Sequence, residues 1–200
     1  ASGVKVFLGT APSVADLAEL KPDTLIVATG SVPVIPRFCE GIANAVTAED
    51  ILTGKAKAGQ RVLVVGGGMV GSETAEYLAA QGRSVTVVEM LPQLAKDMEW
   101  CARVLLLRRM ASLGIKLRSG NEILSIGAGN AVTVRNEKGR EETLSGFDTL
   151  VVAVGCRPDN ALSDGLSAAL DCPCVAVGDC RKTAKIMDAV HSGFEAALTL

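Results

Sequence analysis

Apolar β-branched runs alternate with amphipathic segments along this chain, which predicts a mixed α/β protein. The clearest run is Arg61–Val65, and a cluster of glycines follows it at once. Residues 69–81 then have helical spacing, and Ser84–Val88 is a second β-branched run. The order strand, glycine turn, helix, strand predicts a βαβ-type unit around which the rest of the chain is organised.

Shorter patterns predict the other elements. Residues 122–144 contain three alternating segments separated by glycine-containing turns, which predicts a β-meander. In the helix expected at 97–113, Trp100, Val104, Leu107 and Met110 share one face. We also expect strands at 4–8, 23–30, 116–118, 148–155 and 174–177, and helices at 14–20, 48–52 and 186–200.

A repeated motif predicts the domain organisation. DTLIVATGSVP at 23–33 closely matches DTLVVAVGCRP at 148–158, and the βαβ unit with its meander lies between the two copies. Because Pro33 and Pro36 lack N–H donors, residues 31–36 are expected to cross between domains rather than to continue a ladder. We therefore expect an inserted domain at 56–155 and a second domain built from 1–55 and 156–200.

The glycines after Arg61–Val65 have the spacing of a dinucleotide-binding turn. Gly66 allows the tight turn, Gly68 lets the backbone approach a pyrophosphate, and Gly71 lets the helix pack close to the strand. The helix would direct its N-terminal N–H groups at the phosphates. A glycine-rich turn without a nucleotide is the alternative. The expected cofactor contacts are Gly66, Gly67, Gly68, Met69, Val70, Gly71 and Ser72.

Glu89 ends the second strand, about 20 residues beyond the first glycine, where a carboxylate can accept hydrogen bonds from an adenosine ribose. Its charge would repel a 2′-phosphate, and no arginine follows among residues 90–92, so the pattern favours NADH over NADPH. An exposed acid at a strand end is the alternative. Gly155 ends the last strand of the inserted domain, at the edge where ligands bind in open α/β sheets; a turn glycine is the alternative.

The composition argues against nucleic-acid binding and a membrane span. The 200 residues carry 20 basic and 22 acidic side chains and only 3% aromatics, which gives neither a general field nor a stacking surface for nucleic acid. No apolar run approaches the roughly 18 residues of a membrane span. With six cysteines, no CxxC pair and no evident signal peptide, a cytoplasmic protein with reduced thiols is expected. A metal set of Cys172, Cys174 and Cys180 is the alternative to free thiols.

Four motifs together resemble the two-dinucleotide-fold flavoprotein reductases. They are ATG at 28–30, GGGMVGSE at 66–73, VGCRPDN at 154–160 and AVGDC at 176–180. The resemblance implies a Rossmann-like NAD(P)-binding domain, with a parallel sheet plus a β-meander, inserted into an incomplete FAD-binding domain. It also implies that Thr29, Gly30, Gly178 and Asp179 belong to the FAD site and that Glu73 lies near the nicotinamide. For Glu73 and Asp179, a helix-dipole acid and an Asx turn are the respective alternatives.

The tail at 177–198 resembles the NADH:flavin oxidoreductases of the 2-enoate reductase and 2,4-dienoyl-CoA reductase group. Such enzymes take hydride from NAD(P)H to FAD, then pass electrons through a 4Fe-4S cluster and FMN to an unsaturated substrate. The resemblance implies that the cluster, the FMN and the first glycine turn of the FAD domain belong to upstream domains of the same polypeptide. The chain by itself is therefore expected to be a module that is not active alone.

Two other functions stay open. One is a module of a thioredoxin reductase-like or NADH oxidase-like flavoprotein, and the other is a non-catalytic NAD(H)-sensing module. No catalytic acid or base is identified, because the single histidine, His191, has no evident partner in the sequence. It is expected at the surface of the last helix, and the alternative, from the resemblance, is a segment that approaches the flavin. The basic side chains of Arg181, Lys182 and Lys185 are expected on a solvated face, with a phosphate clamp as the alternative.

Overall fold

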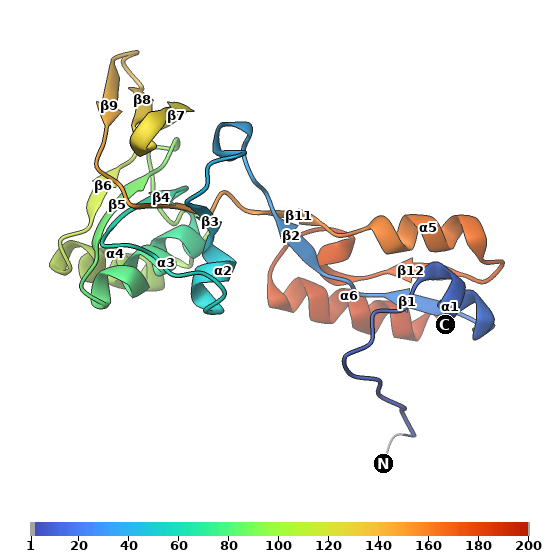
Figure 1. Ribbon diagram of the computed structural model, residues 1–200. Coiled ribbons are helices and arrows are strands. Elements are labelled where there is room, and N and C mark those ends of the chain that lie inside the picture. Colours follow the sequence, from blue (N-terminus) through green and yellow to red (C-terminus); the bar gives the residue numbers. More distant parts are fainter. Residues whose placement is uncertain (1–2, 200) are drawn as a thin grey trace. The chain divides into compact units, whose positions relative to one another are not determined.

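The chain forms two compact units (Figure 1). The computed structural model describes residues 3–199, apart from the side chains of 167 and 168. Residues 33–155 make the larger unit, and residues 3–32 with 156–199 make the smaller one. The first boundary therefore differs from the one expected at residue 55. The reason is that β3 (Ala45–Thr47), which the sequence pattern did not predict, pairs with a central strand of the larger unit.

The larger unit is built on a parallel sheet of five strands in the order β3-β10-β4-β5-β6. A separate antiparallel meander, β7-β8-β9, follows β6 in the chain, as the alternating pattern predicted. The remaining strands are β4 (Arg61–Val65), β5 (Ser84–Val88), β6 (Lys116–Arg118), β7 (Asn121–Ile126), β8 (Val132–Asn136), β9 (Glu141–Leu144) and β10 (Thr149–Val152). The helices are α2 (Ala48–Leu52), α3 (Met69–Ala80) and α4 (Trp100–Ser112), with 3-10 turns η1 (Arg37–Cys39) and η2 (Ala128–Asn130).

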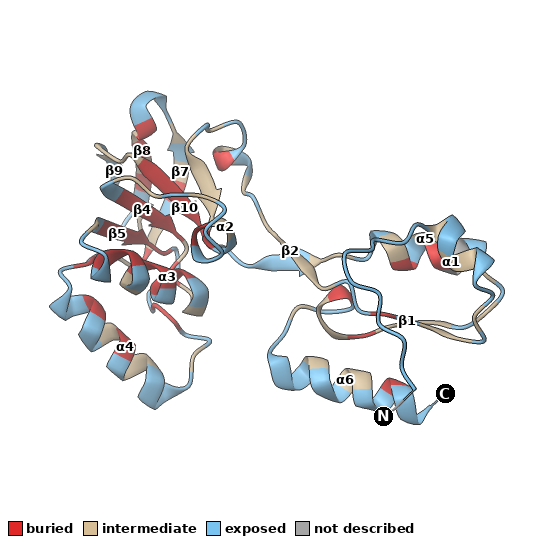
Figure 2. Cartoon of the chain, turned by 60° about the horizontal axis from the view of Figure 1, so that its bottom comes forward, coloured by how far each residue is buried: buried red, intermediate tan, exposed pale blue. Residues whose placement is uncertain are grey.

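Strand β4 is buried on both faces, which explains its unbroken apolar sequence. Val62 and Val64 pack with residues of α3 and α4, whereas Leu63 and Val65 pack with the meander. The period of two along a strand divides its side chains in this way. The unit is thus three layers, with helices below and the meander above the sheet in Figure 1. Its buried residues concentrate in β4, β5 and β10 (Figure 2).

Helix α4 corrects one detail of the predicted pattern. Leu106 and Met110 are its buried residues, while Val104 and Leu107 are half-buried. Trp100, expected on the buried face, is 70% exposed. It is the first residue of the helix, whose buried residues, Leu106 and Met110, lie more than one turn further along.

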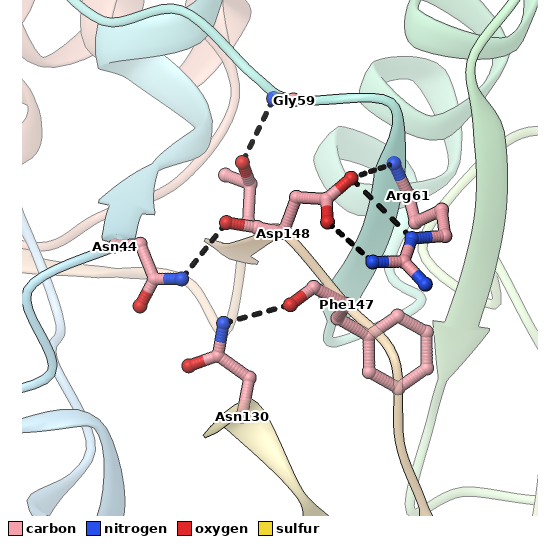
Figure 3. Close-up of polar contacts among 7 residues, drawn as sticks. Asn44, Gly59, Arg61, Asn130, Phe147 and Asp148 are labelled. Atoms are coloured by element: carbon pink, nitrogen blue, oxygen red, sulfur yellow. Dashed lines mark hydrogen bonds and ion pairs between the residues drawn. The ribbon is translucent and has the colours of Figure 1, made fainter. Parts of the chain in front are cut away.

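Hydrogen bonds around Asp148 hold the start of β10 in place (Figure 3). Its carboxylate accepts from the Arg61 backbone N–H and from the Arg61 guanidinium, both at 2.8 Å. Its backbone oxygen accepts from Asn44 Nδ2 at 2.8 Å, and the neighbouring Phe147 oxygen accepts from Asn130 Nδ2 at 2.9 Å. The side-chain hydrogen bond from Arg61, followed by the backbone one, lowers the pKa of Asp148. These contacts join β10 to β4, to the segment before β3 and to the meander.

The smaller unit contains two short strand pairs and three helices. Strand β1 (Leu25–Val27) runs parallel to β12 (Cys174–Ala176), and β2 (Ser31–Pro33) pairs with β11 (Cys156–Pro158). The second pair corrects the expectation that residues 31–36 stay outside any ladder. In a two-stranded pair each strand is an edge strand, where proline is tolerated. The other elements are α1 (Val14–Glu19), α5 (Ala161–Ala169), η3 (Gly178–Cys180) and α6 (Ile186–Leu198).

The core of this unit is small and centres on Val27, Leu166 and Cys180. Helix α6 has Ala196 as its buried residue and exposes Ile186, Val190 and Phe194. The strand expected at 4–8 is not formed, because this exposed segment has no strand partner within residues 3–199. Among the helices of the described chain, none combines the length and the hydropathy needed to cross a membrane.

The ion pair at the start of β10 predicts a pH-dependent stability. The folded-state pKa of Asp148 is depressed, so its stabilisation is present above the unfolded-state pKa of about 3.9 and is lost as the pH falls through the folded value. Asp148→Asn is expected to lower the free energy of unfolding at neutral pH, and the difference from the wild type is expected to shrink at about pH 2, well below the unfolded-state pKa. Urea unfolding at both pH values measures it.

Asp23→Asn is the matched control, since Asp23 holds the same place in the repeated motif and is exposed. It is expected to leave the unfolding free energy unchanged at both pH values. An Asp148→Asn deficit that stays constant across the pH range would contradict the ion-pair explanation.

Candidate functional site

The carboxyl edge of the parallel sheet carries the candidate site. The glycine turn follows β4, Glu89 follows β5, and Gly155 follows β10, so the parallel strands bring all three to one edge. A pocket of about 460 Å³ opens there. Predicted residues that line it are Gly66, Gly68, Met69, Val70, Glu89 and Gly155.

Close contacts in the turn explain its glycines. A Cβ on Gly71 would lie 2.0 Å from the backbone oxygen of Gly66, and one on Gly66, which has φ +97°, would lie 2.5 Å from the oxygen of Ala153. Neither position has room for a side chain. Gly68 differs, because a Cβ there would meet only the Asp97 carboxylate, at 3.8 Å. The backbone at Gly68 is therefore open toward the pocket, as close approach of a ligand requires.

Glu89 is only 9% exposed, and both of its carboxylate oxygens are hydrogen-bonded. Oε2 accepts from the Gly67 N–H at 2.6 Å, and Oε1 accepts from the Leu91 N–H at 2.7 Å. Ser72 is buried and donates its hydroxyl to the Gly67 oxygen at 3.0 Å. Gly67, Gly71 and Ser72 thus shape the turn from behind, and the structure does not place them among the residues lining the pocket.

The N-terminus of α3 has a carboxylate on it that the sequence did not predict. Gly68 is the N-cap and supplies no side chain. Asp97, from the loop between β5 and α4, accepts a hydrogen bond from the Met69 N–H at 2.9 Å. It also lines the pocket. The sequence carries no local signal for this contact, because the two residues are 28 positions apart.

An apolar wall of the pocket was also missed. It comes from η1, from the start of the meander and from the end of β10. These segments are remote in sequence, so only the fold brings them together. The residues are Phe38, Ile123, Ala153 and Val154.

Glu73 does not line this pocket. It is an exposed residue of α3, and its charge contributes to raising the pKa of Arg109, whose largest cause is the hydrogen bond to Glu76. Glu73 therefore lies on the side of α3 that faces Arg109 of α4.

The four residues expected at a flavin site lie together in the smaller unit. Thr29 donates its hydroxyl to the Asp159 oxygen at 2.6 Å, and the Gly30 oxygen accepts from the Asp159 N–H at 3.0 Å. The Asp179 carboxylate accepts from the Ser31 hydroxyl at 3.4 Å. Gly178, at the start of η3, has φ +64° and donates its N–H to Ser192 Oγ at 2.8 Å.

The remaining candidates are dispersed. All six cysteines are free thiols; burial raises the pKa of Cys39 to about 11, and the Cys180 thiol donates toward the Val27 oxygen at 3.1 Å. Within residues 3–199, no three His, Cys, Asp or Glu side chains are grouped as a metal site. His191 is an exposed residue of α6.

Comparison with known proteins agrees with this geometry. The family model for pyridine nucleotide-disulphide oxidoreductases matches residues 2–195. An NADH oxidase of Thermoanaerobacter brockii is 37% identical over 98% of this chain and 31% of its own length, and a cinnamate reductase of Clostridium sporogenes is 31% identical over 98% and 29%. A 2-naphthoyl-CoA reductase structure matches with a TM-score of 0.89 and 31% identity, over 99% of this chain and 30% of its own.

The chain thus spans about 30% of the length of these relatives. The resemblance drawn from the four motifs, and the α/β fold class that it implied, are confirmed. This chain belongs to the pyridine nucleotide-disulphide oxidoreductase family.

Proposed function

We propose that residues 33–155 bind the nicotinamide dinucleotide of a flavin-dependent oxidoreductase, with NADH preferred over NADPH. One observation carries the proposal: the pocket joins an open backbone at Gly68 to the carboxylate of Glu89 across the carboxyl edge of the sheet. The family supports the coarser part of it, since its members bind FAD and NAD(P)H.

In this proposal the glycine turn and α3 bind the pyrophosphate. The N–H groups of residues 68–71 precede the first helical hydrogen bond, from the Ser72 N–H to the Gly68 oxygen at 2.9 Å, and that of Met69 donates to Asp97. Such groups at a helix N-terminus bind phosphate oxygens. The residues present therefore fit a dinucleotide.

Glu89 would bind the adenosine ribose. A carboxylate has about four acceptor sites, and Glu89 uses two of them on the N–H groups of Gly67 and Leu91. Ribose hydroxyls can donate to the others while the backbone bonds remain. A 2′-phosphate would instead bring negative charge against a buried carboxylate, which is the physical basis of the NADH preference.

Bound NADH supplies a hydride, and a bound flavin accepts it. The chain contributes orientation and exclusion of water, for which the wall of Phe38, Ile123 and Val154 is suited. In the smaller unit, Thr29, Gly30, Gly178 and Asp179 would hold the flavin side. Asp179 fits a hydroxyl-bearing ligand, because its carboxylate already accepts from the Ser31 hydroxyl and the Ala184 N–H and has acceptor sites left.

The electrons would pass on to an unsaturated, enoate-like or dienoyl-CoA-like substrate in the full-length protein, with FMN and a 4Fe-4S cluster held by other domains. The relatives named cinnamate reductase and 2-naphthoyl-CoA reductase support this choice. The relative named NADH oxidase, at 37% identity, favours a second candidate, an NADH oxidase-like enzyme.

Titration of the chain with NADH and NADPH, followed by nicotinamide fluorescence, tests the cofactor. We expect at least about tenfold tighter binding of NADH, equivalent to about 1.4 kcal/mol. In Glu89→Gln the ratio of the two dissociation constants is expected to fall toward one, because the repulsion of the 2′-phosphate is removed. A wild-type preference for NADPH, or a ratio unchanged in Glu89→Gln, would contradict the role given to Glu89.

Two alanine variants separate the structural from the binding glycines. Gly71→Ala is expected to lower the free energy of unfolding by about 3 kcal/mol, because its Cβ meets the Gly66 oxygen. Gly68→Ala is expected to stay within about 1 kcal/mol of the wild type but to weaken NADH about tenfold, because its Cβ points to where the pyrophosphate approaches. Urea unfolding and NADH titration measure the two effects. Normal NADH affinity in a folded Gly68→Ala protein would speak against the pyrophosphate site.

The complete polypeptide tests the reaction. Anaerobic mixing with NADH is expected to bleach the flavin absorbance, and addition of cinnamate, as an enoate probe, is expected to restore it. Restoration by oxygen alone would favour the NADH oxidase-like candidate. NADH binding without any bleaching would favour the NAD(H)-sensing module.

A further inference from the structure

The loop between β5 and α4 lies directly on the glycine turn. The Ala95 N–H donates to the Gly67 oxygen at 2.7 Å, and the Leu94 side chain occupies the space beside Gly67, 2.8 Å from where a Cβ would stand. Both residues are buried. The loop is tied at its other side too, because Arg103 of α4 donates Nε–H to the Leu94 oxygen at 2.7 Å. The position of the following residues is therefore fixed by packing and hydrogen bonds.

This anchoring brings Asp97 to the N-terminus of α3. A helix leaves its first N–H groups without partners, and an N-cap side chain usually accepts from one of them. Gly68, the N-cap here, is a glycine and supplies no side-chain cap. Asp97 Oδ1 accepts from the Met69 N–H at 2.9 Å in its place. Its negative charge also complements the positive end of the helix dipole.

The same N–H groups and the same dipole end would bind the pyrophosphate. Two anions at one helix N-terminus weaken each other's stabilisation, because each screens the dipole for the other and the two repel. We propose that Asp97 is a resident anion at the pyrophosphate position, which the dinucleotide must displace from the Met69 N–H in order to bind. The proposal rests on the dinucleotide function proposed above and adds a residue that tunes its affinity.

The local structure allows this displacement. Asp97 is exposed, so its hydrogen bond to Met69 exchanges readily for one with water. Leu94 and Ala95, which hold the loop on the turn, make their contacts without Asp97. Ala95 has φ +47°, a left-handed conformation that alanine adopts at a cost, so the fold maintains this loop path against a local preference. A protein that binds only after losing a competing contact has a reduced apparent affinity.

Two substitutions test the proposal. Asp97→Asn keeps an oxygen acceptor for the Met69 N–H but removes the charge, and Asp97→Ala removes both. We expect both variants to bind NADH about three- to tenfold more tightly than the wild type. The melting temperature without ligand is expected to fall in Asp97→Ala, because the cap is lost, and to fall less in Asp97→Asn. A residue with a merely structural role would lower the melting temperature without tightening NADH.

Ligand fragments locate the effect. ADP-ribose, which keeps the pyrophosphate, is expected to show the same gain in affinity as NADH, and adenosine, which has no phosphate, is expected to show none. Glu99→Gln is the matched control. Glu99 caps α4 by accepting from the N–H groups of Cys101 and Ala102, and these hydrogen bonds lower its pKa. The variant removes one charge beside the loop, outside the pocket, and is expected to leave the NADH affinity unchanged.

The outcomes separate this inference from the function on which it rests. Wild-type binding of NADH with unchanged or weaker affinity in both Asp97 variants would overturn the inference alone. A gain that Glu99→Gln reproduces would also overturn it, because the effect would then be one of general charge. No binding by the wild type or by either variant would overturn both proposals, whereas binding by Asp97→Ala alone would support the displacement strongly.

Discussion

The packing of the larger unit depends on one contact, that between the start of α3 and the end of β4. A Cβ at Gly71 would lie 2.0 Å from the Gly66 oxygen, so the helix can approach the strand only because neither residue has a side chain. This approach lets Ala75 and Leu78 of α3 reach the core beneath the sheet. It also directs the first N–H groups of the helix to the carboxyl edge. The same constraint therefore sets both the packing of the helical layer and the position of the candidate site.

A glycine turn has no side chains of its own to accept hydrogen bonds from its backbone N–H groups, so residues elsewhere in the chain must accept them. Here two carboxylates from outside the turn do so: Glu89 accepts from the Gly67 N–H and Asp97 from the Met69 N–H. They differ in burial. Glu89 is enclosed and bonded through both oxygens, so it forms part of the turn, whereas Asp97 is exposed and bonded through Oδ1. Because of this difference, we assign Glu89 to binding of the ribose and Asp97 to competition with the pyrophosphate.

Those parts of the fold that have local causes could be predicted from the sequence. The strand, turn and helix around Gly66 are specified within about a dozen residues, and the meander by alternation and its turn residues. Strand β3 was missed because its three half-buried residues become a strand only by pairing with β10, about a hundred residues later. Asp97 was missed because its position depends on the left-handed Ala95, a conformation that alanine does not signal. The helical spacing predicted that Trp100 shares the buried face of α4, but spacing alone does not show at which residue the buried part of that face begins.

The place of β10 in the sheet has a consequence for how the protein is made. This strand is the last of its unit to be synthesised, yet it lies between β3 and β4 and pairs with both. Until residue 152 has left the ribosome, β3 cannot join the rest of the sheet, and the edge of β4, which later pairs with β10, stays open. Closing it requires contacts between distant parts of the chain, which form slowly. During that interval the chain exposes an apolar strand edge of the kind that chaperones cover and that drives aggregation.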